Sequence, residues 1–388
     1  MYRIGQPEID AVARVLKSKR MFRYGVTGGE CIRFEERYSA YLGVKHCLMT
    51  ASGTNALTAA LIGLGIGPGD EVLVPACTYM ASAIAVIAAG AIPVVVDIDE
   101  SVTLSPEAVT DAIGPRTRAV MPVHMWGLPC DMNRIMRVVR RRKLLVVEDA
   151  CQAVGGGYRG RKLGSFGDAA AFSFNFFKNM TAGEGGCAIT RTEAAMKRMR
   201  CVVDPCSFYW TGRTEMQSSF LANGARASEI EGAILNVQLD RIDGMLAIMR
   251  RQKSAIRTAG EKAGLTMSPM HSPDDECGTH NFFLLPTAAK AEAFAAAVGG
   301  TVARKTGRHV YTEWVQIFAH QGAHHPALNP FRLPANKWCR MHYTPDMCRQ
   351  SLDILDRTVF TANHPDLKAV DLAKRIKTIR DAAAAIKA

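Results

Sequence analysis

The stretch EVLVPACTYMASAIAVIAAGAIPVVVDIDE, residues 71–100, decides the fold class of this chain. Two apolar runs, Glu71–Val74 and Ile92–Val96, flank an alanine-rich helical pattern over Ser82–Ala89 that Gly90 ends. Runs that are apolar throughout are typical of strands buried on both faces of a parallel sheet. The stretch therefore predicts a strand–helix–strand unit.

The same stretch contains a segment that resembles a membrane span, because Met80–Val96 is almost wholly apolar. Ser82, Gly90 and Pro93 interrupt it, whereas a spanning helix needs about 20 apolar residues without such breaks. The N-terminal residues MYRIGQPEID also lack the apolar core of a signal peptide. We therefore expect no membrane segment.

Strand and helix patterns alternate along the sequence around this unit. Further strands are predicted at Cys47–Thr50, Ala119–Val123, Leu144–Val147, Ala170–Phe174 and Gly186–Thr190, and helices at Asn55–Leu64, Pro106–Ile113 and Met132–Arg141. Strands that alternate with helices predict an α/β fold with a large, mostly parallel sheet covered on both faces.

The pattern changes after Glu229. Residues 229–262 predict one long helix, and a strand at Asn281–Leu285 and helices at Ala288–Val298 and Lys368–Ala384 follow it. A chain of 388 residues is long enough for two domains. We expect a large domain over residues 1–240 and a smaller C-terminal α/β domain over residues 241–388.

Composition narrows the class of partner and the compartment. The formal net charge is +12, and its densest basic run, 137–143, falls within a helical pattern and lacks interleaved aromatic residues. We therefore expect no nucleic-acid surface, and the charge instead favours anionic small molecules. The eleven cysteines are scattered without a CxxC motif, so we expect them to be reduced and the protein to be cytoplasmic.

Two motifs are weak signals of function. Gly155–Gly160 matches GxGxxG, but the residues that follow, RKLGSFGD, do not start a helix as a dinucleotide site requires, so a turn is predicted. His320, His324 and His325 lie in a proline-rich loop without a carboxylate or cysteine at ligand spacing. We predict a solvated loop there and no metal site.

Two further motifs lie where a predicted strand ends. The sequence ASGTNAL, 51–57, leads a strand into a helix through small residues, which suits phosphate binding, although an ordinary N-cap explains it as well. Glu148 and Asp149 end the strand at Leu144–Val147, where parallel sheets bind ligands. Acidic loop residues are common, so this motif alone does not decide between a ligand-binding site and an ordinary solvated loop.

The strongest signal is the sequence SFNFFKNMTAGEGG, 173–186. Its single lysine, Lys178, has Phe174, Phe176 and Phe177 as neighbours, and desolvation by them would lower the pKa of its amine and make it a nucleophile. The alternative is a lysine whose stem packs beside a core strand while its amine reaches water.

A phosphate-binding helix start, a carboxylate at a strand end and a desolvated lysine are the parts that pyridoxal phosphate requires. The chain resembles the DegT/DnrJ/EryC1/StrS family of pyridoxal phosphate-dependent sugar aminotransferases, which have fold type I. The resemblance extends over nearly the whole chain and rests on the motifs SGTNAL, GIGPGDEVLVPACTY, GAIPVVVDID, PRTRAVMPVHMWG, VVEDACQAVGG, GDAAAFSF and KNMTAGEGG.

The resemblance implies catalytic roles for two residues. Lys178 matches the lysine that forms the Schiff base and moves the proton, and Asp149 matches the partner of the ring nitrogen. Gln152 matches the residue beside the ring hydroxyl, and Tyr79 the aromatic residue that stacks on the ring. Glu184 lies on a loop that approaches the sugar in relatives.

The resemblance also implies a set of phosphate-binding residues. Gly53, Thr54 and Ser173 match it directly. Relatives usually add an asparagine two residues before an arginine, which reaches the phosphate in the partner subunit. Here Gly224 stands at that spacing before Arg226, and the asparagine is Asn223, one residue earlier.

The implied reaction moves an amino group from an amino acid, with glutamate expected ahead of glutamine, to a keto- or aldehydo-sugar. A nucleotide-linked sugar and a sugar of the 3-deoxy-octulosonate type are two candidates among such acceptors, and the family implies a homodimer with sites between subunits. One alternative is a deoxysugar dehydratase of the same fold, but those relatives carry histidine where Lys178 stands. The other is a binding or regulatory protein that keeps the pocket without turnover.

Overall fold

The structure, a computed structural model, describes residues 3–24, 28–210 and 220–387. At its centre is a seven-stranded sheet with the order β1-β9-β8-β5-β4-β2-β3. The strands are β1 (His46–Thr50), β2 (Glu71–Pro75), β3 (Ile92–Val96), β4 (Thr117–Val120), β5 (Leu145–Asp149), β8 (Ala169–Ser173) and β9 (Gly186–Thr190). All pairs from β3 to β8 are parallel, and β9 runs antiparallel to both its neighbours. The predicted mostly parallel sheet is confirmed.

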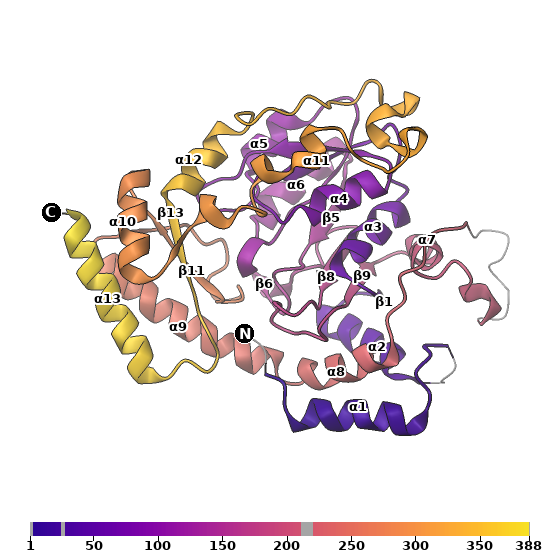
Figure 1. The fold of residues 1–388 in the computed structure, drawn as a ribbon, viewed down its shortest axis with the longest axis horizontal. Coiled ribbons are helices and arrows are strands. Elements are labelled where there is room, and N and C mark those ends of the chain that lie inside the picture. The colour runs from indigo at the N-terminus through magenta and orange to yellow at the C-terminus, as the bar shows by residue number, and fades with distance from the viewer. Residues whose placement is uncertain (1–2, 25–27, 211–219, 388) are drawn as a thin grey trace.

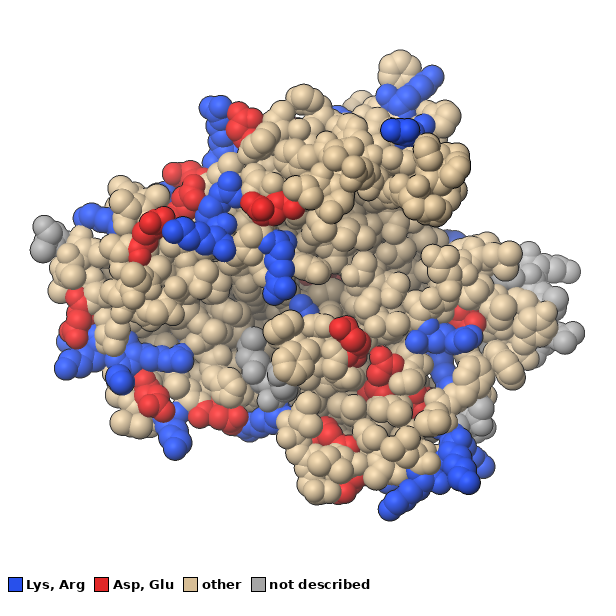
Figure 2. Space-filling view, in the orientation of Figure 1, with Lys and Arg blue, Asp and Glu red and all other residues tan. Residues whose placement is uncertain are grey.

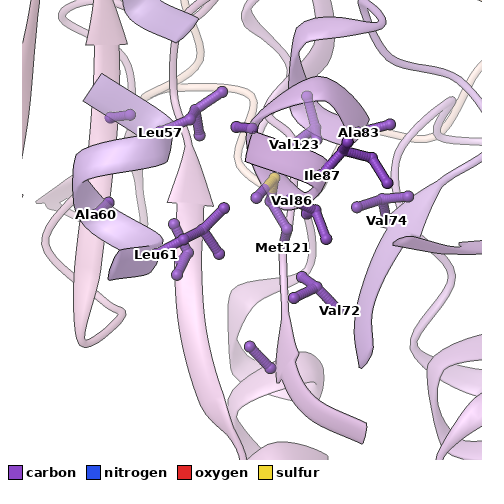
Figure 3. Packing of buried hydrophobic residues seen from close by; sticks show 14 of the residues in the cluster. Leu57, Ala60, Leu61, Val72, Val74, Ala83, Val86, Ile87, Met121 and Val123 are labelled. Carbon is purple, nitrogen blue, oxygen red and sulfur yellow. The ribbon is translucent and has the colours of Figure 1, made fainter. Parts of the chain in front are cut away.

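Helices cover both faces of this sheet (Figure 1). They are α2 (Glu30–Leu42), α3 (Gly53–Gly63), α4 (Ala81–Ala88), α5 (Pro106–Ala112), α6 (Met132–Arg142) and α7 (Glu193–Val203), and α1 (Gln6–Ser18) packs outside them on α8 (Glu229–Leu239). Strand β2 shows why its sequence is apolar throughout. Val72 and Val74 pack in the core under α3 and α4 (Figure 3). Leu73 packs in the core on the other face.

The segment that resembles a membrane span is a buried helix, a turn and a strand. Helix α4 ends before Gly90, whose φ of +85° allows the chain to reverse into β3. Among the described residues, no helix is both long and apolar enough to cross a membrane.

The C-terminal part contains a second, four-stranded antiparallel sheet with the order β10-β11-β13-β12. Its strands are β10 (Thr266–Met267), β11 (His280–Leu284), β12 (Thr301–Val302) and β13 (Thr358–Ala362), and the helices of this part are α9 (Ile242–Lys262), α10 (Ala288–Val298), α11 (Val315–Phe318), α12 (Arg349–Arg357) and α13 (Ala369–Lys387). A separate apolar core lies between this sheet, α9, α10 and α13 (Figure 1). The expected domain boundary at residue 240 falls between α8 and α9, and it stays a prediction.

The prediction of one continuous helix over residues 229–262 is wrong. The structure has two helices, α8 and α9, which meet at Asp240 and Arg241. Asp240 pairs with Arg37 of α2, and Arg241 pairs with the buried Glu8 of α1. These ion pairs with distant residues fix the turn, and no pattern within the segment itself reports them.

The GxGxxG sequence forms a turn, and the three histidines lie in a surface loop. Gly157–Tyr158 (β6) and Arg161–Lys162 (β7) form a hairpin, so the GxGxxG sequence is the predicted turn. His320, His324 and His325 are exposed, and His320 stacks on Phe331. The described residues contain no cluster of three side chains suited to a metal ion.

The basic run 137–143 is exposed at the end of α6, except for Val138 and the buried Val139. Figure 2 shows acidic and basic side chains interspersed over one face of the molecule, with no continuous basic stripe on that face.

Candidate active site

A cavity of about 500 Å³ opens where the parallel strands end. Thr78 follows β2, Trp126 follows β4, Asp149 ends β5 and Ser173 ends β8, and all four line the cavity. The carboxyl ends of parallel strands are where open α/β sheets bind ligands. Eight of the nine residues predicted from the sequence line this one cavity, namely Gly53, Thr54, Tyr79, Asp149, Gln152, Ser173, Lys178 and Glu184.

The first turn of α3 forms one wall. The Ser52 hydroxyl accepts a hydrogen bond from the Asn55 backbone N–H at 3.2 Å, so the N-cap that the sequence allowed is present. The first N–H groups of a helix have no intrahelical acceptor, and they carry the positive end of the helix dipole. Because Gly53 and Thr54 line the cavity, this turn is suited to an anion.

Gly53 is held close to the end of β8. A Cβ atom on Gly53 would lie 2.7 Å from the Ser173 Cβ atom and 3.0 Å from the Cys151 Sγ atom. A side chain there would fill the space between the helix start and the strand end. The missing Cβ therefore keeps open a cradle lined by backbone and by the hydroxyl-bearing Thr54 and Ser173.

Asp149 lies in the floor of the cavity and is 5 % exposed. Its Oδ2 atom accepts a hydrogen bond from the Ser82 hydroxyl at 2.7 Å, and its Oδ1 atom accepts one from the Cys151 backbone N–H at 3.1 Å. Hydrogen bonds donated to both oxygens hold the carboxylate in one orientation. Asp149 therefore offers a fixed negative charge to a cationic group in the cavity.

Lys178 lies at the tip of the connection between β8 and β9. The Phe174 N–H donates to the Gly185 carbonyl at 2.8 Å, and the Phe176 N–H donates to the Gly183 carbonyl at 2.9 Å. Gly183 and Gly185 have φ values of +87° and +125°, which side chains disfavour. The glycine-rich sequence thus closes a turn that presents the lysine to the cavity.

Burial lowers the pKa of the Lys178 amine, and the Arg308 guanidinium lowers it further, whereas Cys151 and Asp149 act in the opposite direction. The lowered pKa of this amine and its main cause, desolvation, agree with the sequence-based expectation, but the three predicted phenyl rings do not all surround the amine. Phe174 packs in the core against Phe34, and Phe176 and Phe177 are 48 % and 62 % exposed. Burial in the cavity, which Phe177 lines and Phe174 and Phe176 do not, desolvates the amine.

Gln152 and Glu184 lie on other parts of the cavity wall. The Gln152 Oε1 atom accepts the Trp126 backbone N–H at 3.2 Å. The Glu184 carboxylate accepts a hydrogen bond from the Asn175 side-chain amide at 2.9 Å and is exposed. Glu184 therefore belongs to the solvent-exposed part of the cavity lining.

Asn223 is the one predicted site residue outside the cavity. It is exposed, next to Gly224, whose φ is +78°. The neighbouring Ala225 accepts a hydrogen bond from the Ala51 N–H at 2.8 Å, which brings this loop to the end of β1. Within its own chain Asn223 does not line the cavity, and the predicted contact across a dimer stays a prediction.

Two further residues of the cavity, both from the C-terminal part, stand in no motif that predicts them. Arg308 and His309 line the cavity although they follow Lys178 by 130 positions or more. The Arg308 guanidinium lies 5.9 Å from the ring centres of Tyr79 and of Phe177, and it makes no hydrogen bond or ion pair with a described residue. Burial and the nearby Arg308 lower the pKa of His309 to about 4, so its ring is neutral at neutral pH.

Comparison with known proteins shows which family shares this sequence and fold. The family model described as the DegT/DnrJ/EryC1/StrS aminotransferase family matches residues 3–327. A GDP-perosamine synthase of Caulobacter vibrioides is 41 % identical over 255 residues, which are 64 % of this chain and 67 % of that protein. A dTDP-3-amino-3,4,6-trideoxy-alpha-D-glucose transaminase of Streptomyces venezuelae is 39 % identical over 276 residues, with 70 % of both chains covered.

A solved structure has the same fold over nearly its whole length. It is DesV of S. venezuelae in complex with a ketimine intermediate, with a TM-score of 0.73 and 29 % identity over 97 % of this chain and 94 % of that one. The cofactor of this family is pyridoxal phosphate, and the cavity fits it. The cradle at Gly53 suits the phosphate, the carboxylate of Asp149 suits the ring nitrogen, and the amine of Lys178 suits the aldehyde.

Proposed function

Because this chain belongs to the DegT/DnrJ/EryC1/StrS aminotransferase family, we propose that it moves an amino group from glutamate to a keto- or aldehydo-sugar that carries an anionic group. The chain is a pyridoxal phosphate-dependent sugar aminotransferase. The proposal adds which amino acid donates the amino group, which kind of sugar accepts it and which residues act. The observation that carries it is the convergence of Lys178, Asp149 and the start of α3 on one cavity.

Pyridoxal phosphate, when bound, supplies an aldehyde that takes up the amino group and a ring that withdraws electrons from the reacting carbon. Lys178 provides the neutral amine that its lowered pKa makes available, and its Nζ atom returns the proton to the substrate carbon. Asp149 holds the proton on the ring nitrogen through its fixed negative charge. Gly53, Thr54 and Ser173 bind the phosphate, and Tyr79 covers the ring.

Arg308 supports an anionic substrate. An arginine over two aromatic rings, without a carboxylate partner among the described residues, is free to pair with a carboxylate or a phosphate. Glutamate carries such a group, and so does an acceptor that is nucleotide-linked or of the 3-deoxy-octulosonate type. The net charge of +12 acts in the same direction by attracting anions.

We further propose a cytoplasmic homodimer with Asn223 reaching the partner's phosphate cradle. Leu221 is 90 % exposed and Phe177 62 %, an exposure of large apolar side chains that a second subunit would relieve. All eleven cysteines are free thiols, which suits a reducing compartment. Light scattering of the purified protein measures the dimer directly, and a monomer at working concentration would contradict this part.

The function is tested in two steps on the purified holoenzyme. Borohydride reduction followed by peptide mass spectrometry is expected to find the cofactor fixed to Lys178. On a separate, unreduced sample, glutamate is expected to bleach the visible absorbance, and a matched panel of anionic and neutral keto-sugars is expected to restore it, with the anionic members faster. A label on another lysine, or no response to any amino donor, would contradict the proposal.

A further inference from the structure

Trp126 has an unusual backbone conformation for a bulky residue. It lies in the short turn Met125–Gly127 after β4, with φ +52° and ψ +27°, in the left-handed region. Residues with a Cβ atom avoid this region, and a bulky residue stays there only where its surroundings hold it. The side chain is 7 % exposed, and its ring packs against Phe282 and Phe360 at centre distances of 5.6 and 5.0 Å.

Two hydrogen bonds hold the peptide groups of Trp126 from opposite sides. The Thr279 hydroxyl, just before β11, donates to the Trp126 carbonyl at 2.6 Å. The Trp126 N–H donates to the Gln152 Oε1 atom at 3.2 Å. A chain of contacts therefore joins the C-terminal sheet, through one strained residue, to a side chain of the cavity.

The next residue, Gly127, packs closely against the segment before β11. Gly127 has a φ of +82°, and a Cβ atom on it would lie 2.6 Å from the Cys277 Cβ atom. The Cys277 N–H also donates to the Gly127 carbonyl at 3.1 Å. On its other side Thr279 is anchored, because its carbonyl accepts the Asn363 N–H at 2.7 Å. The turn and the segment before β11 thus fit in one relative position.

This chain of contacts fixes which way the Gln152 amide faces. A backbone N–H needs an acceptor, so the atom of Gln152 nearest to Trp126 is the amide oxygen. The two protons on Nε2 are then left for the cavity that Gln152 lines. If the backbone of Trp126 changed its conformation, the Gln152 amide would lose the N–H donor that selects its oxygen over its nitrogen.

We propose that Thr279 and Trp126 are positioning residues that hold the Gln152 amide with its Nε2 protons toward the ring hydroxyl of the cofactor. The inference rests on the proposed role of Gln152 beside that hydroxyl. A hydrogen bond donated to the ring oxygen stabilises its ionised form, so it lowers the pH at which the holoenzyme's visible absorbance changes. Loss of the positioning contact therefore raises this midpoint.

The experiment measures the pH midpoint of the visible absorbance change in purified enzyme saturated with pyridoxal phosphate. Thr279→Val, which removes the hydroxyl and keeps the shape, is expected to raise the midpoint by about 0.5–1 pH unit, the equivalent of one hydrogen bond. Thr279→Ser keeps the hydroxyl and is expected to restore the wild-type midpoint. Thr361→Val, a hydroxyl lost elsewhere on the same sheet, serves as the matched control and is expected to leave it in place.

A double-variant cycle separates positioning from a general loss of packing. Gln152→Ala alone is expected to raise the midpoint, and adding Thr279→Val to it is expected to raise it no further. If Thr279→Val does not fold, Thr279→Ala removes the same hydroxyl and replaces it in every comparison. The inference is overturned if the Thr279→Val or Thr279→Ala enzyme binds the cofactor and keeps the wild-type midpoint. It is also overturned if Thr279→Ser shifts the midpoint as much as Thr279→Val does, or if the shifts caused by Gln152→Ala and Thr279→Val add. A wild-type enzyme that takes up no cofactor would instead contradict the proposed function.

Discussion

The Ser82 hydroxyl donates a hydrogen bond of 2.7 Å to the Oδ2 atom of Asp149, and both residues are buried. Ser82 lies in the first turn of α4 and Asp149 at the end of β5, so the contact joins a covering helix to the floor of the cavity. A second hydroxyl, that of Thr78, lies 2.7 Å from the Ser82 oxygen and completes a buried polar chain. The orientation of the carboxylate therefore depends on α4 as well as on β5.

Asp149→Asn and Ser82→Ala are expected to slow the half-reaction with glutamate to different extents. The amide cannot hold the ring-nitrogen proton, so the rate falls about 100-fold, as for the loss of a charged hydrogen bond of about 3 kcal/mol. Ser82→Ala removes one of two donors and costs about fivefold, or about 1 kcal/mol. Stopped-flow absorbance measures both rates. Equal effects of the two changes, or a wild-type rate in Asp149→Asn, would refute the assigned role.

Lys178→Ala is expected to abolish turnover and leave the fold intact. The variant has no amine to bind the cofactor covalently, so borohydride fixes none at this site. Lys377→Ala, on the exposed side of α13, is the matched control and keeps full activity. Circular dichroism and thermal unfolding check that both variants fold. Substantial transaminase activity in Lys178→Ala would show that another group performs the chemistry.

Cofactor capture by the apoenzyme is expected to depend on pH through Lys178. The neutral amine attacks the aldehyde, and burial lowers the pKa of this amine, so the rate of capture rises with pH and levels off below the range of an ordinary lysine. Arg308 also lowers this pKa, so Arg308→Gln moves the midpoint to higher pH. Rapid-mixing absorbance over a pH series measures the rate. A midpoint that stays fixed or falls in Arg308→Gln would contradict the electrostatic assignment.

Gly53→Ala is expected to weaken cofactor binding. The added Cβ atom would lie 2.7 Å from the Ser173 Cβ atom, which forces the helix start and the strand end apart where the phosphate binds. A displacement that costs about 1–3 kcal/mol raises the dissociation constant about 5- to 150-fold. Equilibrium titration of the apoenzyme measures it. The same substitution at Gly244, which has open space around its Cβ position, is the control, and equal affinities in both variants would argue against the cradle.

Removing one partner of the buried ion pair of Lys253 and Glu276 is expected to destabilise the protein more than replacing both partners. Its Nζ and Oε1 atoms lie 2.6 Å apart, and both side chains are at most 6 % exposed. Glu276→Gln leaves a buried cation without its partner and lowers the free energy of unfolding by about 3–5 kcal/mol.

The double change Lys253→Met with Glu276→Met is expected to recover most of that loss, because neither charge remains. Asp353→Asn removes the 64 % exposed carboxylate of an ion pair with Arg357, costs less than about 1 kcal/mol and serves as the control. Urea unfolding measures all four proteins. A double variant as unstable as Glu276→Gln would show that packing, not the unpaired charge, sets the cost.

Most strands and helices could be predicted because their patterns are local. The strand sequence EVLV and the helix that ends at Gly90 lie where expected, since burial on both sides of a sheet leaves its mark on every residue of a strand. The continuous helix over 229–262 failed because the break depends on ion pairs of Asp240 and Arg241 with α2 and α1. Such partners are far away in the sequence.

Lys178, Asp149 and the start of α3 could be found from the sequence, because each stands in a motif whose spacing reflects a strand end or a glycine turn. The sequence alone did not decide what desolvates the lysine: only the fold packs Phe174 in the core, exposes Phe176 and brings Phe177 and Arg308 to the cavity. Nor could it place Thr279 on the carbonyl of Trp126. A local pattern records the backbone conformation and the burial of its own residues, whereas contacts across more than a hundred positions exist only once the sheets and helices have packed.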